Sequence, residues 1–223
     1  MLSDSDPRIA QGYERLKAEW DKVGPSDSDV ITYLINPQFE GKPAWPGGRQ
    51  AYRVVRPSNS LILASDGLSD PFVGTDMIDR QGFGCEVYIE APELAGADFK
   101  KLSESWAFQL IENFAMNVAD WGGLSQQLQI NGVMSLELPA HGIIPHKWLS
   151  SDGNAGFLVG MPAPGRPVWI GDMPFGEVDL IALTLITPGE LNRIVAGGGH
   201  ARRTLAAELA AVGLHSASRL DRL

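Results

Sequence analysis

Residues 174–194 constrain the fold more than any other part of the chain, because they specify a turn, a strand and a capped helix in direct succession. From Leu180 onward, apolar residues occupy both faces of the strand, which is typical of a central strand covered on each side. Thr187 stands at the N-cap, Pro188 takes the first helical position, and Glu190 follows three residues after the cap. The sequence therefore predicts a central strand that leads into a helix beginning at Pro188.

The N-terminal part predicts one helix, one strand and an anchored loop. Asp6 is placed to cap a helix over residues 7–22, whose apolar side chains recur at intervals of three and four. A short apolar run predicts a strand at residues 30–35. Residues 39–48 are rich in glycine and proline, and Trp45 is expected to anchor them as an ordered surface loop.

The middle of the chain predicts a long helix among several strands. Ser103 is placed to cap this helix, which presents a broad apolar surface over residues 106–118 and ends at Gly122. A glycine triplet at residues 197–199 predicts a break between two C-terminal helices, since no Gly-Lys-Ser/Thr follows it to cradle a phosphate. The remaining strands are predicted at residues 51–56, 61–64, 83–90, 127–130, 133–138, 156–161 and 168–170.

Composition narrows the class of protein and the kind of partner. With 223 residues and 44% hydrophobic content, the chain is expected to form a single domain over residues 1–223. A formal net charge of -9 repels polyanions, which disfavours nucleic acid and favours basic protein partners. No apolar run has the length of a membrane span and no signal-peptide pattern is present, so we expect a cytoplasmic protein without membrane contact.

Cys85 is the only cysteine of the sequence, which excludes an intrachain disulfide and a thiolate-rich metal site. The alternation over residues 83–90 places its thiol on the apolar face of a strand, where we expect it to be buried and inert. Glu86 and Glu90 share the other face of this strand and are expected to be solvated charges.

An enzymatic site would have to assemble across loops from Asp66, Asp70, His141 and His146. A glycine and a proline between the two histidines prevent a helix from bringing both rings onto one face, and no further ligand stands at metal-binding spacing. The turn at residues 65–69 lacks the Gly-x-Ser-x-Gly pattern of a nucleophile elbow. An enzyme with such a loop-assembled site is therefore an alternative hypothesis, and no cofactor is expected.

Six tryptophans are a further functional clue, because tryptophan is enriched both in cores and in binding hot spots. Trp20 and Trp106 fit the core faces of helices. Trp45, Trp121 and Trp148 fall in predicted loops or at the ends of elements, where each can anchor a loop or contact a partner. The sequence leaves both roles open.

Three separated blocks resemble the suppressor of fused (Sufu-like) domain family. They are the turn Ser-Asp-Gly-Leu-Ser-Asp at residues 65–70 with the glycine-started strand at 82–89, the long helix at 106–119, and the closing strand and helix at 174–194. The resemblance spans residues 60–212, with a helix and strands of residues 1–59 packed on this part. It implies an α+β fold, with a mixed or antiparallel sheet packed by a long central helix and by N- and C-terminal helices.

The resemblance also implies a function. Eukaryotic members of the family bind a short linear segment of a transcription factor as an added strand, and bacterial relatives are associated with toxin neutralisation as immunity proteins. For a bacterial member, it implies a non-catalytic module that sequesters a protein partner, either a basic toxin or a linear peptide segment. An oligomeric scaffold subunit is the other alternative to the enzyme.

Candidate partner-binding residues follow from the positions that the family uses. The family's aromatic residue near the end of the long helix falls at Asn117, and its acidic position falls at Gln126 or Gln127. Trp121 lies between them at the predicted end of the helix. The chain thus departs from the family pattern at these positions, which predicts a changed partner on a retained fold.

Overall fold

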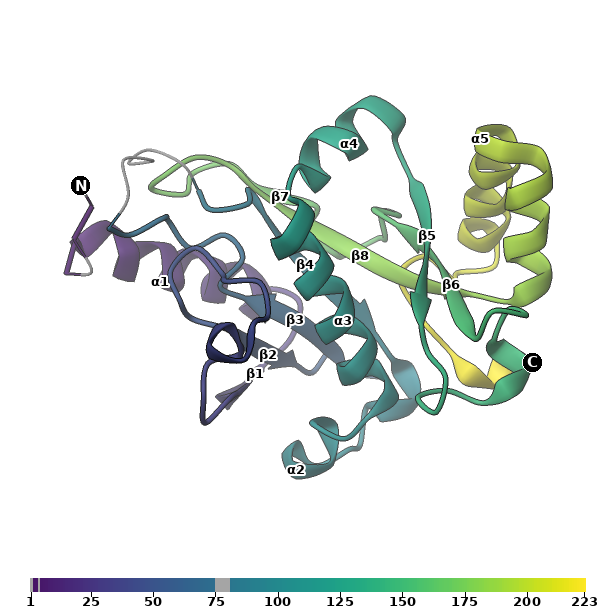
Figure 1. The fold of residues 1–223 in the computed structure, drawn as a ribbon, viewed down its shortest axis with the longest axis horizontal. Coiled ribbons are helices and arrows are strands. Elements are labelled where there is room, and N and C mark those ends of the chain that lie inside the picture. The colour runs from purple at the N-terminus through teal and green to yellow at the C-terminus, as the bar shows by residue number, and fades with distance from the viewer. Residues whose placement is uncertain (1, 4, 75–80) are drawn as a thin grey trace.

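The computed structural model describes residues 2, 3, 5–74 and 81–223, in which eight strands form one mixed sheet (Figure 1). The strands are β1 (Ser26–Thr32), β2 (Ala51–Val55), β3 (Ile62–Asp66), β4 (Cys85–Glu90), β5 (Met134–Pro139), β6 (Asn154–Val159), β7 (Trp169–Ile170) and β8 (Val178–Ile186). Their order is β1-β2-β3-β4-β8-β6-β5, with β7 paired to β8. β4 and β8 are parallel, and the other pairs of named strands are antiparallel.

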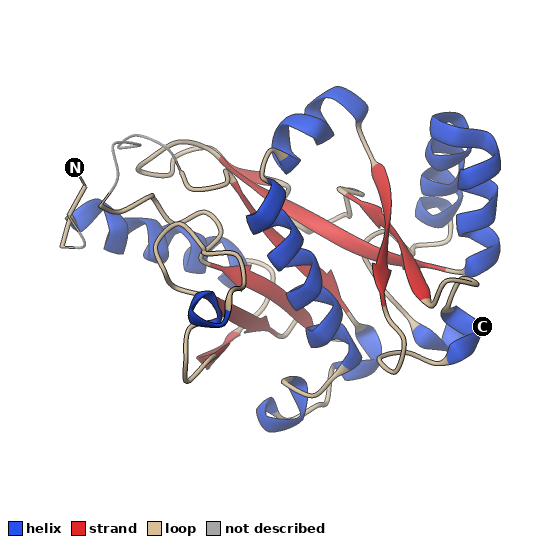
Figure 2. Ribbon diagram, in the orientation of Figure 1, coloured by secondary structure: helices blue, strands red, loops and turns tan. Residues whose placement is uncertain are grey.

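Helices cover both faces of this sheet. The α-helices are α1 (Pro7–Asp21), α2 (Phe99–Leu102), α3 (Trp106–Trp121), α4 (Leu124–Asn131) and α5 (Pro188–Ala211). Helix α3 lies across one face of the sheet (Figure 2), α1 packs on the other face, and α5 packs on β6. Within the described residues, no helix combines the length and the apolar character needed to cross a membrane.

Strand β8 is central, as its sequence predicts. It lies between β4 and β6, and its side chains alternate between two apolar layers. Ile181, Leu183 and Leu185 pack in the layer under α3. Leu180 and Ala182 pack in the layer under α1. Burial of both faces explains why the strand is a nearly continuous apolar run.

The predicted start of α5 is confirmed in detail. The Thr187 hydroxyl accepts a hydrogen bond from the Glu190 N–H at 3.2 Å, and the Glu190 carboxylate accepts one from the Thr187 N–H at 2.7 Å. This reciprocal capping box satisfies two N–H groups that would otherwise lack partners. Gly198 has φ 58° and ψ -145°, so the predicted glycine break divides α5 into two helical stretches.

The predicted strand at residues 30–35 is wrong in its position, because β1 runs from Ser26 to Thr32. Its pairing with β2 ends where Thr32 opposes Ala51, the first residue of β2. Asn36 then caps a short 3₁₀ helix, Pro37–Glu40, by accepting a hydrogen bond from the Gln38 N–H at 3.0 Å. The apolar residues after Thr32 therefore lie outside the sheet.

Two further predictions are corrected around α3. Residues 127–130 belong to α4 and not to a strand, because Leu124 and Leu128 stand one helical turn apart and both pack against the core. The N-cap of α3 is Ser105 and not Ser103. The Ser105 hydroxyl accepts a hydrogen bond from the Phe108 N–H at 3.2 Å.

Candidate functional site

The open edge of β5 and the groove beside it form the candidate site. Strand β5 is the last of the sheet, and its outer edge pairs with no other described strand. A groove of about 420 Å³ lies along this edge, between β5 and the ends of α3 and α4. Its walls are mostly apolar and are formed by Phe114, Val118, Trp121, Leu124, Met134, Leu136 and Leu138.

Two glycines position the helices that border the groove. Gly122 and Gly123 follow α3 directly and have φ values of 65° and 68°, which a residue with a Cβ adopts only under strain. They redirect the chain so that α4 starts at Leu124. Trp121, the last residue of α3, is 84% exposed beside the groove, whereas Val118 one turn earlier is buried. An exposed tryptophan next to an apolar groove is typical of a protein-binding surface.

The sheet register shows which backbone groups of β5 face the open edge. The Ala140 N–H donates to the carbonyl of Gly153 at 3.2 Å, and the residues of β5 and β6 oppose each other without interruption from this point. Because antiparallel hydrogen-bonded pairs alternate along a strand, Met134, Leu136 and Leu138 direct their N–H and C=O groups toward β6.

The intervening residues of β5 direct their backbone groups outward. Ser135 and Glu137 each present one N–H and one C=O at the open edge, and Pro139 presents only a C=O. Pro139 opposes Asn154 at a position without ladder hydrogen bonds to β6, so its missing N–H costs nothing within the sheet. An incoming strand would therefore find two N–H donors, and the ladder would end at Pro139.

Three of the four candidate partner-binding residues line this groove. Asn117, Trp121 and Gln127 line it. Gln126 is exposed on α4 and does not line it. The backbone edge of Ser135 and Glu137 was not among the sequence candidates, since a strand pattern does not show whether one edge stays unpaired.

The residues of the alternative enzymatic site do not converge. Asp66 ends β3, whereas His141 and His146 follow β5 and are exposed. β3 and β5 are four strand positions apart in the sheet, which corresponds to about 19 Å at ~4.8 Å per strand. Within the described residues, no group of three or more histidine, cysteine, aspartate or glutamate side chains is placed to hold a metal ion.

Asp66 and Asp70 are held in ion pairs instead. Asp66 accepts hydrogen bonds from Arg49 at 2.8 Å and from Arg53 at 2.6 Å. Asp70 accepts from Arg49 at 3.1 Å and from the Tyr13 hydroxyl at 3.4 Å. These buried carboxylates join α1 and the loop before β2 to the turn after β3, which is a structural task.

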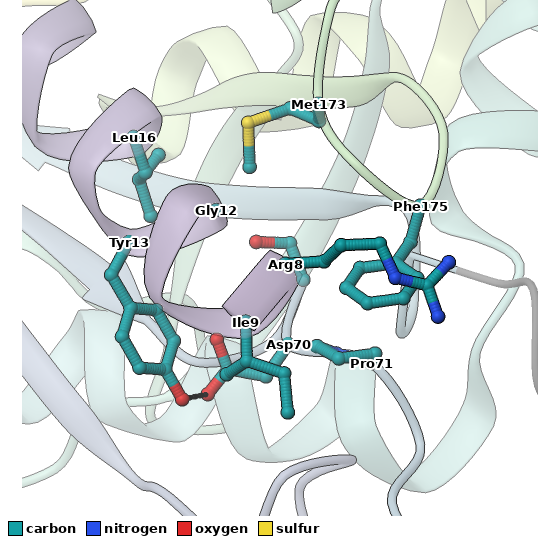
Figure 3. Close-up of a pocket in the computed structure, with 10 residues that line it drawn as sticks. Arg8, Ile9, Gly12, Tyr13, Leu16, Asp70, Pro71, Met173 and Phe175 are labelled. Atoms are coloured by element: carbon teal, nitrogen blue, oxygen red, sulfur yellow. Dashed lines mark hydrogen bonds between the residues drawn. The ribbon is translucent and has the colours of Figure 1, made fainter. Parts of the chain in front are cut away.

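The hollow beside this ion-pair cluster is too small for a ligand (Figure 3). Its volume is about 10 Å³, which admits a single water molecule at most. Tyr13 points to Asp70 from one side (Figure 3). On the other side, the guanidinium carbon of Arg8 lies 4.7 Å from the centre of the Phe175 ring. The hollow is therefore a packing defect under α1.

The expectation that Glu86 is a solvated charge is wrong. Glu86 is fully buried, and its carboxylate accepts hydrogen bonds from the N–H groups of Gly67 at 3.0 Å and Ser69 at 2.9 Å. The hydroxyls of Ser69 and Ser65 donate to it at 2.7 Å and 2.5 Å. Burial, together with the charge of nearby Asp66, raises the pKa of Glu86 to about 7. This side chain organises the Gly-Leu-Ser-Asp turn.

Glu90 is also buried, which again contradicts the expectation. Burial disfavours its ionisation, but hydrogen bonds from Arg166, Ser60 and Ser216 outweigh this effect and lower the pKa of Glu90. Arg166 binds both carboxylate oxygens, at 2.6 Å and 2.9 Å. Ser216 belongs to the C-terminal segment, which folds back against the end of β4. No local sequence pattern indicates that this distant segment covers the glutamate.

Cys85 is buried as predicted, and burial raises the pKa of its thiol well above the ordinary value. Trp45 and Trp148 are buried, so both are loop anchors. The Trp148 indole N–H donates to the carbonyl of Leu220 at 3.1 Å, which fixes the C-terminal segment. Of the three tryptophans left open by the sequence, only Trp121 is available to a partner.

Comparison with known proteins supports the fold. No protein-family model and no curated protein sequence matches the chain. A structure described as the Sufu-Fu complex crystal structure matches with a TM-score of 0.58 and 16% identity, over 95% of this chain and 91% of that chain. The structure of Drosophila suppressor of fused matches with a TM-score of 0.55 and 16% identity, over 95% of this chain and 49% of that one.

The chain therefore has a Sufu-like α+β fold, as its separated sequence motifs predict. It spans about half of the Drosophila protein that it matches. At 16% identity the likeness concerns the fold, and the use of the β5 edge has to be argued from this chain's own residues.

Proposed function

We propose that this chain is a non-catalytic protein-binding module that accepts an extended segment of its partner as an added strand on β5. The observation that carries the proposal is the unpaired edge of β5 beside an apolar groove. The Sufu-like fold is consistent with this role, since one of the similar structures is a complex of Sufu with Fu.

The geometry of β5 indicates how the segment would bind. The added strand would exchange backbone hydrogen bonds with Ser135 and Glu137, and these bonds would set its register. Every second side chain of the added strand would point toward α3, where Val118 and Trp121 border the groove. The backbone would supply affinity, and the groove would select apolar side chains at alternate positions.

A basic protein is the partner class that we infer for this site. The formal net charge of -9 favours encounter with cationic proteins, and the exposed Glu137 lies on the open edge itself. In its sharpest form, the proposal is that the chain sequesters a basic toxin as a bacterial immunity protein in the cytoplasm. Capture of the partner as a strand would block it without any chemical step.

Affinity capture with two variants at one position tests the proposal. Glu137→Pro removes an outward N–H without removing a bond to β6, whereas Glu137→Gln keeps the N–H and removes only the charge. Wild-type and variant chains would serve as baits in extract of the native host at low ionic strength, with captured proteins identified by mass spectrometry. We expect the partner to be lost with Glu137→Pro and retained with Glu137→Gln.

Two results would contradict strand addition at β5. In the first, both variants retain the same partner as the wild type, and in the second, the wild type captures no protein. Circular dichroism of each variant would establish that the sheet is intact, since the substituted group faces away from β6.

A further inference from the structure

A second hollow lies on the same side of the sheet as α3 but at the opposite end from β5. It has a volume of about 520 Å³ and is bounded by the segment that follows β1 and by α3. Its lining includes Tyr33, Ile35 and Glu40 from the segment after β1, and Glu112 and Met116 from α3. This hollow shares no lining residue with the groove beside β5.

Exposed apolar side chains are concentrated at this hollow. Leu34 is fully exposed and Ile35 is 63% exposed, and both line the hollow. Phe39 is 78% exposed and lies in the 3₁₀ helix between the lining residues Pro37 and Glu40. Scattered apolar residues are normal on a protein surface, but a contiguous group beside a hollow is typical of an interaction site. The loop holds these side chains outward because β1 ends at Thr32 and the 3₁₀ helix Pro37–Glu40 follows closely.

The hollow also carries acidic groups without cationic partners. In the described part of the chain, neither Glu40 nor Glu112 forms an ion pair, and Glu112 accepts a hydrogen bond from the Tyr33 hydroxyl. Lys42 lines the same hollow and leaves it with a net negative charge. Two carboxylates that form no ion pair within the described residues, beside apolar side chains, are complementary to a cation flanked by apolar groups.

We propose that this hollow is a second docking surface, for a protein segment that carries lysine or arginine next to leucine-like side chains. The cation would bind Glu112 and Glu40, and the flanking apolar groups would cover Leu34 and Phe39. Contact at this surface is made by side chains rather than by strand addition. The two sites lie on different faces of α3, since this hollow is lined by Glu112 and Met116 and the groove beside β5 by Val118 and Trp121.

A binding assay with a defined probe tests this surface. The probe is a fluorescein-labelled peptide in which leucine alternates with lysine, and binding to the full chain is followed by fluorescence anisotropy at low and physiological ionic strength. We expect Glu40→Gln with Glu112→Gln to weaken binding about tenfold, and Leu34→Ser with Phe39→Ser to do the same. Leu34, Phe39 and Glu40 are exposed and Glu112 is partly buried, so thermal unfolding would establish that each variant folds.

Matched controls separate this surface from general acidity and from the β5 edge. Val195→Ser with Glu208→Gln changes one exposed apolar and one exposed acidic residue on α5, and should leave the affinity unchanged. Glu137→Pro should also leave it unchanged, so failure here is distinct from failure at β5. Equal affinities for all variants, or equal binding of a leucine–glutamate peptide, would overturn the proposal.

Discussion

The two halves of the sheet are stabilised by different chemistry. In the half formed by β1 to β4 and the turn after β3, buried charged residues are frequent: Arg53, Asp66, Asp70, Glu86 and Glu90. In the half formed by β8, β6 and β5, no described charged residue is buried, and the core is made of aliphatic and aromatic side chains. The first half depends on matched polar partners, and the second depends on close packing.

The two outer edges differ in the same way. The pairing of β1 with β2 shifts between Ser26 and Val30, and β1 carries Asp27 and Asp29. Irregular register and charge are common devices that keep an edge strand from pairing with another chain. The register of β5 is uninterrupted, and Glu137 is its only charged residue. This contrast indicates that β5 is the edge left available for a partner strand.

The largest expected effect tests the dependence of the first half on buried ion pairs. Arg49→Met leaves Asp70 without its cationic partner and weakens the pairing of Asp66. We expect the free energy of unfolding to fall by about 3 kcal/mol, because an uncompensated buried carboxylate is costly. Urea denaturation measures this loss.

Arg193→Met is the matched control in the covering helix of the second half, where the arginine pairs with Glu208 at the surface. It should leave the urea midpoint unchanged within error. Equal losses in the two variants would show that buried charge does not distinguish the halves.

A smaller effect concerns the pH dependence of stability. The pKa of Glu86 rises from its ordinary value of 4.5 to about 7 in the folded state, so the folded state binds more protons than the unfolded state between these values. The contribution of Glu86 to the free energy of unfolding therefore becomes less favourable as pH rises through this window. Glu86→Gln should lose this dependence and gain stability relative to the wild type from pH 5 to pH 8.

Glu90→Gln should change the pH dependence of stability in the opposite direction. Because the pKa of Glu90 is lowered in the folded state, its contribution is present above the ordinary value of 4.5 and is lost as pH falls through the lowered pKa. The gap in stability between Glu90→Gln and the wild type should therefore narrow only in acid. Parallel pH profiles for the two variants would contradict the assignment of a raised and a lowered pKa.

The smallest expected effect sharpens the comparison of the two edges. Glu137→Val and Asp29→Val each replace an exposed carboxylate on an edge strand, and each should change the free energy of unfolding by less than about 0.5 kcal/mol. Only Glu137→Val should promote association of the chain with itself, since its edge is regular and otherwise uncharged. Sedimentation velocity over a range of concentrations would detect this, and association of both variants alike would break the comparison.

Local motifs were predictable because their physics is contained in a few neighbouring residues. The capping box of Thr187 and Glu190, the helix stop at Gly122 and the two-sided apolar pattern of β8 each follow from adjacent sequence. Predictions failed where one short segment fits both a strand pattern and a helix pattern. The sequence of residues 127–130 predicts a strand, whereas these residues belong to a helix whose apolar side is formed by Leu124 and Leu128.

The candidate site was predictable only in part. The end of α3 was identified through Asn117 and Trp121, but the open backbone edge of β5 depends on which strands become neighbours. Glu86 and Glu90 share a strand face, as the sequence indicates, and yet both are buried. Their partners, the turn at Ser69 and the C-terminal Ser216, approach from outside the strand.

The sequence by itself determined where α5 starts, where α3 ends and which strand is central, because caps, glycines and apolar periodicity act over a few residues. The resemblance of three separated motifs to the Sufu-like family predicted the scaffold to which they belong. Only the tertiary structure decided which carboxylates are buried, which tryptophan is exposed and which strand edge is unpaired. These properties depend on contacts between residues far apart in the chain, and no local pattern records whether a distant segment covers a side chain or leaves it open.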